Sequence, residues 1–268
     1  MMNDLQKAVL EILIDVDKVC RENDIIYFLD SGTALGAVRH GGFIPWDDDI
    51  DIGMPRDDYE KFLKIAQEKL GDEYFVQTLD TEKKYHKIFA KIRKNGTKFV
   101  EPATRNVKMH QGIYIDVFPY DCIERERAVE SLQELDQLRY RLHCMTLPDC
   151  MEVPSKSIKY IKKEIKTRIK FFVFKLYGRQ KTIEKINNLI YENSNKKEDC
   201  VLVSYAYNIF PLIFEQNIFF PAKEIMFEEH SFFVQHDVDK YLTLIYGDYM
   251  QLPDEENRLT HSPLELEL

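Results

Sequence analysis

Two aspartates, Asp49 and Asp51, stand two positions apart, with Asp47 and Asp48 directly before them. Because consecutive side chains of a strand point to opposite faces, Asp49 and Asp51 would share one face of a strand. Two carboxylates held this close repel one another unless a cation lies between them. A hard divalent cation that takes oxygen ligands and bridges phosphates, Mg²⁺ or Mn²⁺, fits this arrangement. Asp49 and Asp51 are therefore the first candidate metal ligands, and Asp47 and Asp48 are secondary ones.

A third carboxylate, Asp116, interrupts an alternating apolar pattern over 113–118 that predicts a strand. Acidic residues are depleted from strands, so a single one in apolar surroundings needs a reason. Asp116 could complete a second metal position or accept a proton from an attacking hydroxyl group, and the sequence does not separate these roles. We take Asp49, Asp51 and Asp116 together as the candidate catalytic residues.

Two cations, Lys91 and Arg93, share one face of a second alternating strand pattern. The Asn95-Gly96 pair that follows is typical of a type I′ turn and predicts a hairpin with the next segment. Lys91 and Arg93 would lie on the cationic face of this hairpin and bind phosphates. The alternative is a pair of exposed strand cations without a ligand.

A turn of small residues, with Gly32 and Thr33, precedes the acidic stretch. A glycine between a strand and a helix lets backbone N–H groups approach an anion closely, so Gly32 and Thr33 are candidates for binding a phosphate. Arg39 and His40 follow and could pair with the acidic strand or with a bound donor. For His40, a structural role fits the sequence as well as a catalytic one.

Several kinds of site could use this acidic stretch. An EF-hand loop counted from Asp47 would need Gly at its sixth position and Glu at its twelfth, where the chain has Ile52 and Asp58. A glycosyltransferase would use an Asp-x-Asp pair to hold Mn²⁺ on a diphosphate. A nucleotidyltransferase-like site would combine a Gly-Thr turn, an Asp-x-Asp strand and a later strand with one aspartate, in the order found here. Acids that only solvate the end of a strand are the structural alternative.

The spacing of apolar residues predicts the elements that would position these side chains. A helix over 57–70 would begin at Asp57 as its N-cap and end at Gly71. From residue 123 the pattern changes to long helices, with a connection that contains Pro148 and Pro154. The predicted helices cover roughly 5–20, 34–39, 57–70, 123–145, 156–176 and 179–196. The predicted strands cover 25–29, 74–79, 87–93, 97–100 and 113–118, together with the acidic strand, which stops at Pro55.

These elements indicate an α+β fold, a nucleotidyltransferase-like mixed β-sheet core flanked by helices, with a mainly helical C-terminal half. We expect a catalytic core over 1–122, a helical extension with a basic face over 123–200, and a segment over 201–268 that packs back on the core. Within the extension, residues 156–185 hold eleven Lys or Arg against two acids. Such a basic segment can lie on an anionic membrane surface or be a solvated helix face.

The composition of the chain restricts its function class. At 268 residues and 44% hydrophobic residues it can bury a sizeable core, and its net charge of −9 argues against a nucleic-acid partner. The five widely spaced cysteines favour reduced thiols over a disulfide framework or a zinc site. The N-terminal stretch has no pattern of a signal peptide, and no run reaches the roughly 20 apolar residues of a membrane-spanning helix. We therefore expect a cytoplasmic protein, with a peripheral contact at the inner face of the plasma membrane through 156–185.

Taken together, these motifs resemble the LicD family, the phosphocholine transferases related to fukutin and fukutin-related protein. The likeness touches nearly the whole chain, although residues 123–200 match only as generic helices. The long first block makes the resemblance specific. The motifs that carry it are Ser31 to Asp51 (SGTALGAVRHGGFIPWDDDID), Lys91-Ile92-Arg93 with Thr97, Gly112 to Pro119 (GIYIDVFP), and Tyr246 to Met250 (YGDYM) with Leu252-Pro253.

The resemblance implies a nucleotidyltransferase-like fold and a metal-dependent transfer of phosphocholine. The donor would be CDP-choline, the leaving group CMP, and the acceptor a sugar hydroxyl of a bacterial surface glycan such as a teichoic acid, lipopolysaccharide or capsule precursor, which could be lipid-linked. Another CDP-alcohol or polyol-phosphate donor would use the same chemistry. From a different class, the chain could be a nucleotide- or glycan-binding module without catalysis, although the intact set of three acids argues against this.

Choline is a quaternary ammonium, which proteins usually hold against aromatic faces. Trp46, the only tryptophan, stands next to the acidic strand, and Tyr114 precedes Asp116 by two positions. Both are candidates for binding choline. With 12% aromatic residues, any site in this chain would have aromatic neighbours, and Tyr27, Tyr205 and Tyr207 are equally open.

Overall fold

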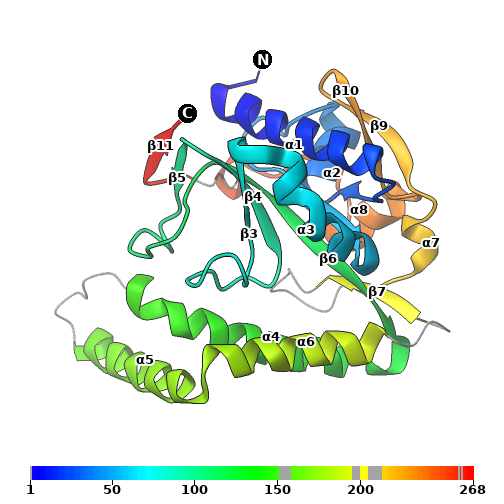
Figure 1. The fold of residues 1–268 in the computed structure, drawn as a ribbon. Coiled ribbons are helices and arrows are strands. Elements are labelled where there is room, and N and C mark those ends of the chain that lie inside the picture. The colour runs from blue at the N-terminus through cyan, green and yellow to red at the C-terminus, as the bar shows by residue number, and fades with distance from the viewer. Residues whose placement is uncertain (1, 151–157, 195–199, 205–212, 259, 261) are drawn as a thin grey trace.

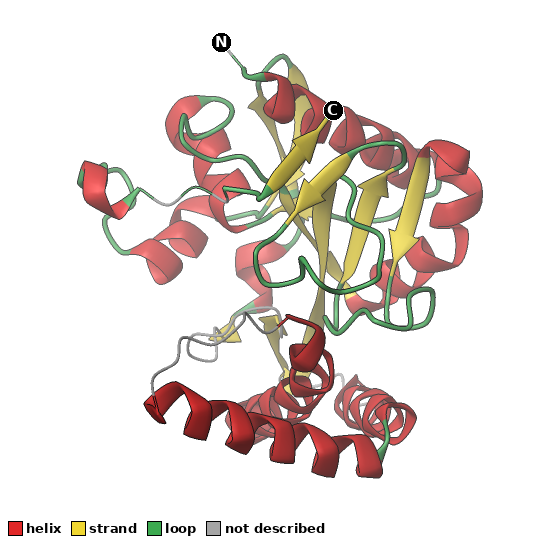
Figure 2. Ribbon diagram, turned by 90° about the vertical axis from the view of Figure 1, so that its left-hand side faces the viewer, coloured by secondary structure: helices red, strands yellow, loops and turns green. Residues whose placement is uncertain are grey.

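The computed structural model describes residues 2–150, 158–194, 200–204, 213–258, 260 and 262–268. A mixed β-sheet with helices packed on it forms one part of the molecule, and three long helices form a layer beside it (Figures 1 and 2). This arrangement confirms the predicted α+β class. The division into 1–122, 123–200 and 201–268 stays a prediction.

The main sheet has seven strands among the described residues, in the order β1-β2-β6-β4-β3, with β7 paired to β6 and β8 to β7. Only β2 and β6 pair in parallel, and the other neighbours are antiparallel. The strands of this sheet are β1 (Phe28–Leu29), β2 (Asp51–Pro55), β3 (Tyr74–Gln77), β4 (Ala90–Lys94), β6 (Tyr114–Glu124), β7 (Cys200–Ser204) and β8 (Ile213–Phe214).

The long strand β6 joins the parts of the sheet because different stretches of it pair with different neighbours. Its first residues pair with β4, its middle pairs with β2, and its last residues, Tyr120 to Glu124, pair with β7. In Figure 1 β6 runs diagonally from the upper end of the sheet towards the helical layer. β6 therefore carries Asp116 at one end and meets the three-helix layer at the other.

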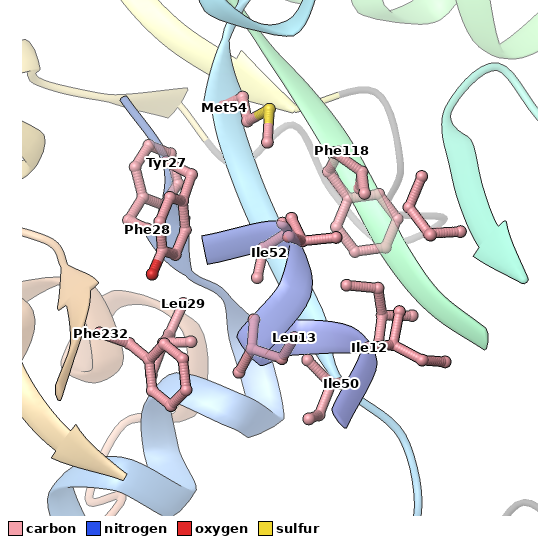
Figure 3. Packing of buried hydrophobic residues seen from close by; sticks show 14 of the residues in the cluster. Ile12, Leu13, Tyr27, Phe28, Leu29, Ile50, Ile52, Met54, Phe118 and Phe232 are labelled. Carbon is pink, nitrogen blue, oxygen red and sulfur yellow. The ribbon is translucent and has the colours of Figure 1, made fainter. Parts of the chain in front are cut away.

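Two helices, α1 (Asp4–Glu22) and α3 (Arg56–Leu70), cover one face of the sheet. Their apolar side chains meet Ile50, Ile52 and Ile115, all fully buried, in one large core. Figure 3 shows Ile50 and Ile52 of this core near Leu13 of α1. Asp51 and Asp116 are sequence neighbours of these isoleucines. Because side chains alternate along a strand, both aspartates point to the opposite face of the sheet. The predicted helices over 5–20 and 57–70 are confirmed, except that α3 begins after Pro55, its N-cap, and Asp57 lies in the first turn.

Helix α2 (Ser31–His40) begins earlier than the predicted 34–39 because Asp30 caps it. The Asp30 carboxylate accepts a hydrogen bond from the Ser31 N–H at 2.8 Å. Gly41, in the left-handed conformation, ends the helix. The turn expected at Gly32 and Thr33 is therefore the first turn of a helix, directly after strand β1.

The helical layer consists of α4 (Arg125–Cys150), α5 (Ile158–Tyr177) and α6 (Arg179–Ser194), which confirms the three predicted helices over their described residues. α4 continues past Pro148, five residues beyond the predicted end, while Pro154 lies outside the described residues. Buried side chains of α4, α6 and β7 form a second core, which includes Leu138, Ile186 and Val201.

The C-terminal part of the chain returns to the sheet region. The 2-stranded sheet β9 (Lys223–Phe227) and β10 (His230–Val234) precedes α8 (Val238–Tyr246), which packs beside α2. The remaining described elements are α7 (Gln216–Phe219), the short 3-10 helices η1 (Gly71–Glu73) and η2 (Glu255–Asn257), β5 (Lys98–Val100) and β11 (Glu265–Glu267). None of the described helices is long and apolar enough to cross a membrane.

The prediction of a hairpin at Asn95-Gly96 is wrong. The turn forms there, with Gly96 at a φ of 78°, but β4 pairs with β3 and β6 on its two sides. β5, after the turn, pairs with the C-terminal strand β11 instead. A strand that already has two neighbours has no free edge for a third, so local turn chemistry did not decide the pairing.

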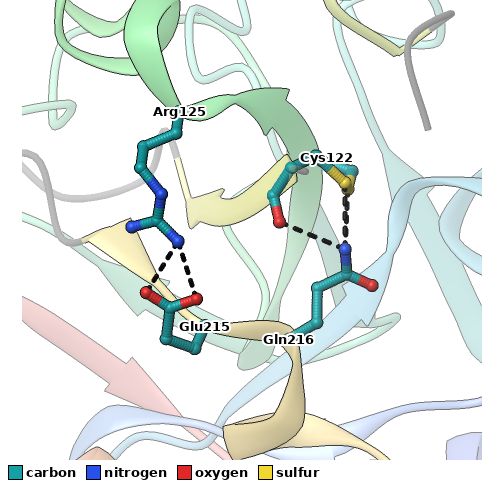
Figure 4. Close-up of a disulfide and its surroundings, with 5 residues drawn as sticks. Cys122, Arg125, Glu215 and Gln216 are labelled. Carbon is teal, nitrogen blue, oxygen red and sulfur yellow. Dashed lines mark hydrogen bonds and ion pairs between the residues drawn. A yellow bond between two sulfur atoms is a disulfide. The ribbon is translucent and has the colours of Figure 1, made fainter. Parts of the chain in front are cut away.

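The expectation that all five cysteines are reduced is also wrong, because Cys122 and Cys200 form a disulfide (Figure 4). They are 78 positions apart in sequence, but β6 and β7 pair and bring their Cα atoms to 5.5 Å. The side-chain amide of Gln216 donates to both sulfur atoms. Cys20 and Cys144 are free and buried. Sequence spacing alone could not reveal a bridge that depends on which strands are neighbours.

Candidate active site

Asp51, Asp116 and Lys91 lie side by side on three adjacent strands. Asp51 of β2 is the register partner of Asp116 of β6, and Asp116 is in turn the partner of Lys91 of β4. In-register neighbours point to the same face of a sheet, so the three side chains share one face. The structure thus brings together residues that are 25 to 65 positions apart along the chain.

Backbone contacts fix the start of β2 at this position. The Asp51 N–H donates to Thr33 Oγ1 at 2.9 Å, and the Asp30 N–H donates to the Asp51 carbonyl at 2.9 Å. On the other side, the Asp116 N–H donates to the Ile50 carbonyl at 2.9 Å. The N-terminus of α2, the start of β2 and the start of β6 therefore meet at one point.

Lys91 provides the counter-charge for Asp116. Its ammonium group lies 2.9 Å from Asp116 Oδ1 and donates a hydrogen bond to Oδ2 at 3.3 Å. Lys91 is 3% exposed, so this ion pair is held away from bulk water. Oδ1 is buried and accepts no well-directed hydrogen bond from any described residue. An oxygen in this state is suited to a further ligand.

Burial and nearby negative charges raise the pKa values of Asp51 and Asp116. Burial raises the pKa of Asp51 well above its ordinary value, and the negative charges of Asp49 and Asp116 raise it further. Burial also raises the pKa of Asp116, although Lys91 opposes this effect. The carboxylates form an electrostatically strained group that a bound cation would relieve. Among the described residues, however, no three His, Cys, Asp or Glu side chains are already arranged to hold a metal ion.

The other predicted acids lie near this group. A Cβ atom added to Gly32 would stand 2.9 Å from Asp47 Oδ2, so this glycine lets the Asp47 carboxylate approach the start of α2. Asp47 and Asp49 both act on the pKa of Asp51. Asp48 is buried, and its N–H donates to Asp47 Oδ1 at 3.2 Å. The stretch 47–51 is therefore one cluster of carboxylates.

Arg93 and Lys91 are both buried, which contradicts the alternative of two exposed strand cations. Arg93 donates from Nε to Gln77 at 2.6 Å and from Nη1 to the Gly112 carbonyl at 2.7 Å. Its guanidinium thus holds neighbouring segments together beside the acidic group. Contact of Lys91 and Arg93 with a donor phosphate stays a prediction.

Arg39 and His40, at the end of α2, face the C-terminal segment. Arg39 Nη1 donates to the Tyr249 carbonyl at 2.7 Å, and Arg39 Nε donates to His40 Nε2 at 3.0 Å. Burial lowers the pKa of both side chains, and for His40 the charge of Arg39 lowers it further. None of these contacts joins either residue to the carboxylates.

Both aromatic candidates for choline already carry cations of the chain on their rings. Lys91 Nζ lies 3.2 Å from the centroid of the Tyr114 ring, and the guanidinium carbon of Arg258 lies 4.5 Å from that of Trp46. These contacts demonstrate that both faces accept a cation. Tyr27 is buried in the core, and Tyr205 and Tyr207 lie outside the described residues.

Four polar residues at the site, Asp30, Tyr120, Tyr241 and Tyr246, had no assigned role in the sequence analysis. Asp30 is fully buried and accepts hydrogen bonds from the hydroxyl groups of Tyr120 and Tyr241. Its position before a small-residue helix start is an N-cap signal that could have drawn attention to it. Burial and the charges of Asp51 and Asp30 raise the pKa of Tyr246. Only the fold brings the distant tyrosines here.

Comparison with known proteins identifies relatives along the whole chain. This chain is 28% identical over 266 residues to the lipopolysaccharide cholinephosphotransferase LicD of Haemophilus influenzae, and the match covers 97% of this chain and 95% of that protein. It is 45% identical over 66 residues to an uncharacterized protein of Rickettsia prowazekii, covering 24% of this chain and 25% of the relative.

Human ribitol 5-phosphate transferase FKRP is 53% identical over 52 residues, which are 19% of this chain and 10% of FKRP. The family described as LicD/FKTN/FKRP, nucleotidyltransferase domain, matches residues 24–167, more than half of the chain. This range holds β1, α2, β2, β4 and β6, and with them every carboxylate of the site. The chain therefore belongs to the LicD/FKTN/FKRP family of nucleotidyltransferase domains.

Proposed function

We propose that this protein transfers phosphocholine from CDP-choline to a sugar hydroxyl of a bacterial surface glycan and releases CMP. By its family it is a phosphotransferase. The observation that carries the proposal is the meeting of Asp51 and Asp116 on neighbouring strands, in a chain similar over 97% of its length to a lipopolysaccharide cholinephosphotransferase. Phosphoryl transfer depends mainly on positioning and on neutralising charge, which suits a site built from fixed carboxylates and cations.

In this proposal Asp49, Asp51 and Asp116 hold Mg²⁺ or Mn²⁺. The oxygen chemistry of the three side chains fits a hard divalent ion. Asp116 Oδ1 is ion-paired with Lys91 at 2.9 Å but accepts no well-directed hydrogen bond from the described residues. Such an ion, when bound, would neutralise charge on the donor diphosphate and the leaving CMP. Asp116 has the second possible role of accepting the proton of the attacking hydroxyl, which its raised pKa would favour.

The cations and the start of α2 would bind the donor phosphates. Lys91 is the side chain nearest to the carboxylates among those we assign to this task, and the first turn of α2 at Gly32 and Thr33 offers backbone N–H groups. Tyr114 and Trp46 are the proposed choline contacts. For choline to stack on Tyr114, Lys91 would have to move aside or share the ring, and for choline to stack on Trp46, Arg258 would have to do so.

A second candidate keeps the chemistry and changes the transferred group to a polyol phosphate. The similarity of a short segment to a ribitol 5-phosphate transferase favours including this class of donor. An Asp-x-Asp glycosyltransferase and a binding module without catalysis are both disfavoured by the family match.

The test is CMP release from CDP-choline, CDP-ethanolamine and CDP-ribitol, each with Mg²⁺, Mn²⁺ or EDTA and with a bacterial glycan extract as acceptor. We expect release from CDP-choline only with a metal and much faster with acceptor. Asp49→Asn should reduce turnover at least about 100-fold. The matched control, Asp57→Asn, removes an exposed carboxylate on α3 and should change turnover less than about twofold.

Three results would contradict the proposal. Metal-dependent CMP release that is undiminished in Asp49→Asn would exclude this carboxylate as a metal ligand. Absence of CMP release from every CDP-alcohol, with folded protein and with acceptor, would exclude the donor class. Release from CDP-ribitol alone would replace phosphocholine with the polyol candidate.

A further inference from the structure

Helix α5 exposes a row of large apolar side chains to solvent. Leu176 is 71% exposed and Phe172 is 62% exposed, values far above those of the buried core. Single exposed apolar residues are common, but a contiguous row on one element indicates a binding surface. We call this row the apolar stripe; its members are Ile165, Ile169, Phe172, Val173 and Leu176.

The stripe occupies the outer side of α5. At about 100° per residue, its five members fall within an arc roughly 100° wide, which is the face of an amphipathic helix. The other side of α5 packs against α4. The ring centroids of Phe174 and Tyr140 are 6.4 Å apart, and the guanidinium carbon of Arg141 lies 5.3 Å from the centroid of the Tyr177 ring. In Figure 1 α5 lies at the edge of the helical layer, away from the sheet.

Cations border the stripe on both sides. Around the helix Lys166 falls beyond one margin of the arc, and Arg168 and Lys175 fall beyond the other, and all three are exposed. The sequence from Ile165 to Tyr177 contains no acidic residue, although the whole chain has a net charge of −9. This distribution of charge gives α5 the opposite sign to the molecule as a whole.

We propose that α5 docks this protein on the surface of an anionic lipid bilayer, with the apolar stripe inserted among the acyl chains and the bordering cations at the headgroups. A helix with an apolar arc between two rows of lysine or arginine lies in the plane of a membrane interface, because long cationic side chains reach the phosphates while their stems remain apolar. A second copy of the chain is a poorer partner, since two such faces would bring like charges together.

The experiment is cosedimentation of the full-length protein with vesicles, without donor or acceptor, so that the result does not depend on the proposed reaction. We expect binding to vesicles of phosphatidylcholine with about one-third phosphatidylglycerol, weaker binding at 0.5 M salt, and little binding to pure phosphatidylcholine. Leu176→Ser should lower the partition coefficient about tenfold, and Lys166→Gln and Lys175→Gln about fivefold each.

Val129→Ser is the matched control, because Val129 is an exposed apolar residue of α4 outside the stripe, and it should bind as the wild type does. Circular dichroism checks that each variant is folded. No binding to anionic vesicles at either salt would overturn the proposal, as would binding that Leu176→Ser leaves unchanged. A dimer in light scattering that Leu176→Ser dissociates would assign the stripe to self-association instead.

Discussion

On β2, β6 and β4, the charged side chains of Asp51, Asp116 and Lys91 are held largely away from solvent, whereas on α5 Lys166 and Lys175 stand in water beside exposed apolar groups. The first arrangement is unfavourable for folding, because ions lose hydration and like charges repel. The second is unfavourable for solubility, because apolar area stays hydrated. Each region thus carries a local cost that folding alone does not explain, which is the usual mark of a functional surface.

The two regions are stabilised by separate cores. Side chains of α1, α3 and the sheet form the larger core, and side chains of α4, α6 and the end of β6 form the smaller one. Substitutions should therefore affect the two functions independently: changes at the carboxylates should alter turnover without altering membrane binding, and changes on α5 the reverse. Variants in each region test this separation.

Asp51→Asn should separate activity from stability. We expect turnover to fall at least about 100-fold, while the metal-free protein becomes more stable at pH 7. The pKa of Asp51 in the folded protein is raised above 3.8. The stability that protonated Asp51 contributes to the fold is therefore fully present below pH 3.8 and is lost as the pH rises through the folded-state pKa. At pH 7 the ionised side chain destabilises the fold. Urea unfolding in EDTA measures this, and a loss of stability in the variant would contradict it.

Lys91→Met should destabilise the protein by about 3 kcal/mol, because it leaves the Asp116 carboxylate buried without its counter-charge. The double variant Lys91→Met/Asp116→Asn should recover most of this loss, since the unpaired charge is then absent. Urea unfolding of wild type, both single variants and the double variant gives the coupling energy. Additive effects would mean that the 2.9 Å pair contributes nothing to stability.

His86 should make the free energy of unfolding depend on pH. Burial, with smaller contributions from Lys87 and His143, lowers its pKa to about 3 from 6.5. The stability given by neutral His86 is therefore fully present above pH 6.5 and is lost as the pH falls towards 3, by up to about 1.4 kcal/mol per pH unit. His86→Gln should flatten this slope, whereas His230→Gln, at an exposed site, should not. Equal slopes in wild type and His86→Gln would refute the assignment.

The smallest expected effect on folding is at the apolar stripe. Leu176→Ala should change the free energy of unfolding by no more than about 0.5 kcal/mol, because this side chain is exposed. Leu138→Ala, which truncates a leucine 1% exposed in the same helical layer, should cost about 2 to 5 kcal/mol. Similar losses for both would indicate that α5 is covered in the isolated protein.

The α+β fold class could be predicted from the sequence, whereas the assignment of Asp49, Asp51 and Asp116 to a metal site stays a prediction. The helices α1, α3, α4 and α6 could be predicted from their apolar spacing, because that spacing is a local property. The strand face predicted to carry both Asp49 and Asp51 is not confirmed, because β2 begins at Asp51 and Asp49 precedes it. The family also followed from contiguous motifs.

Contacts between residues far apart in sequence depend on the tertiary structure. The register that sets Asp51 beside Asp116, the insertion of β4 between β3 and β6, the Cys122–Cys200 bridge and the burial of Asp30 under Tyr120 and Tyr241 depend on strand order. Strand order is chosen by the packing of the whole core, whereas turn residues such as Asn95-Gly96 favour a pairing by only a small local energy. At the predicted hairpin, turn preference and core packing favour different pairings. Core packing determines the observed one because it buries far more apolar surface.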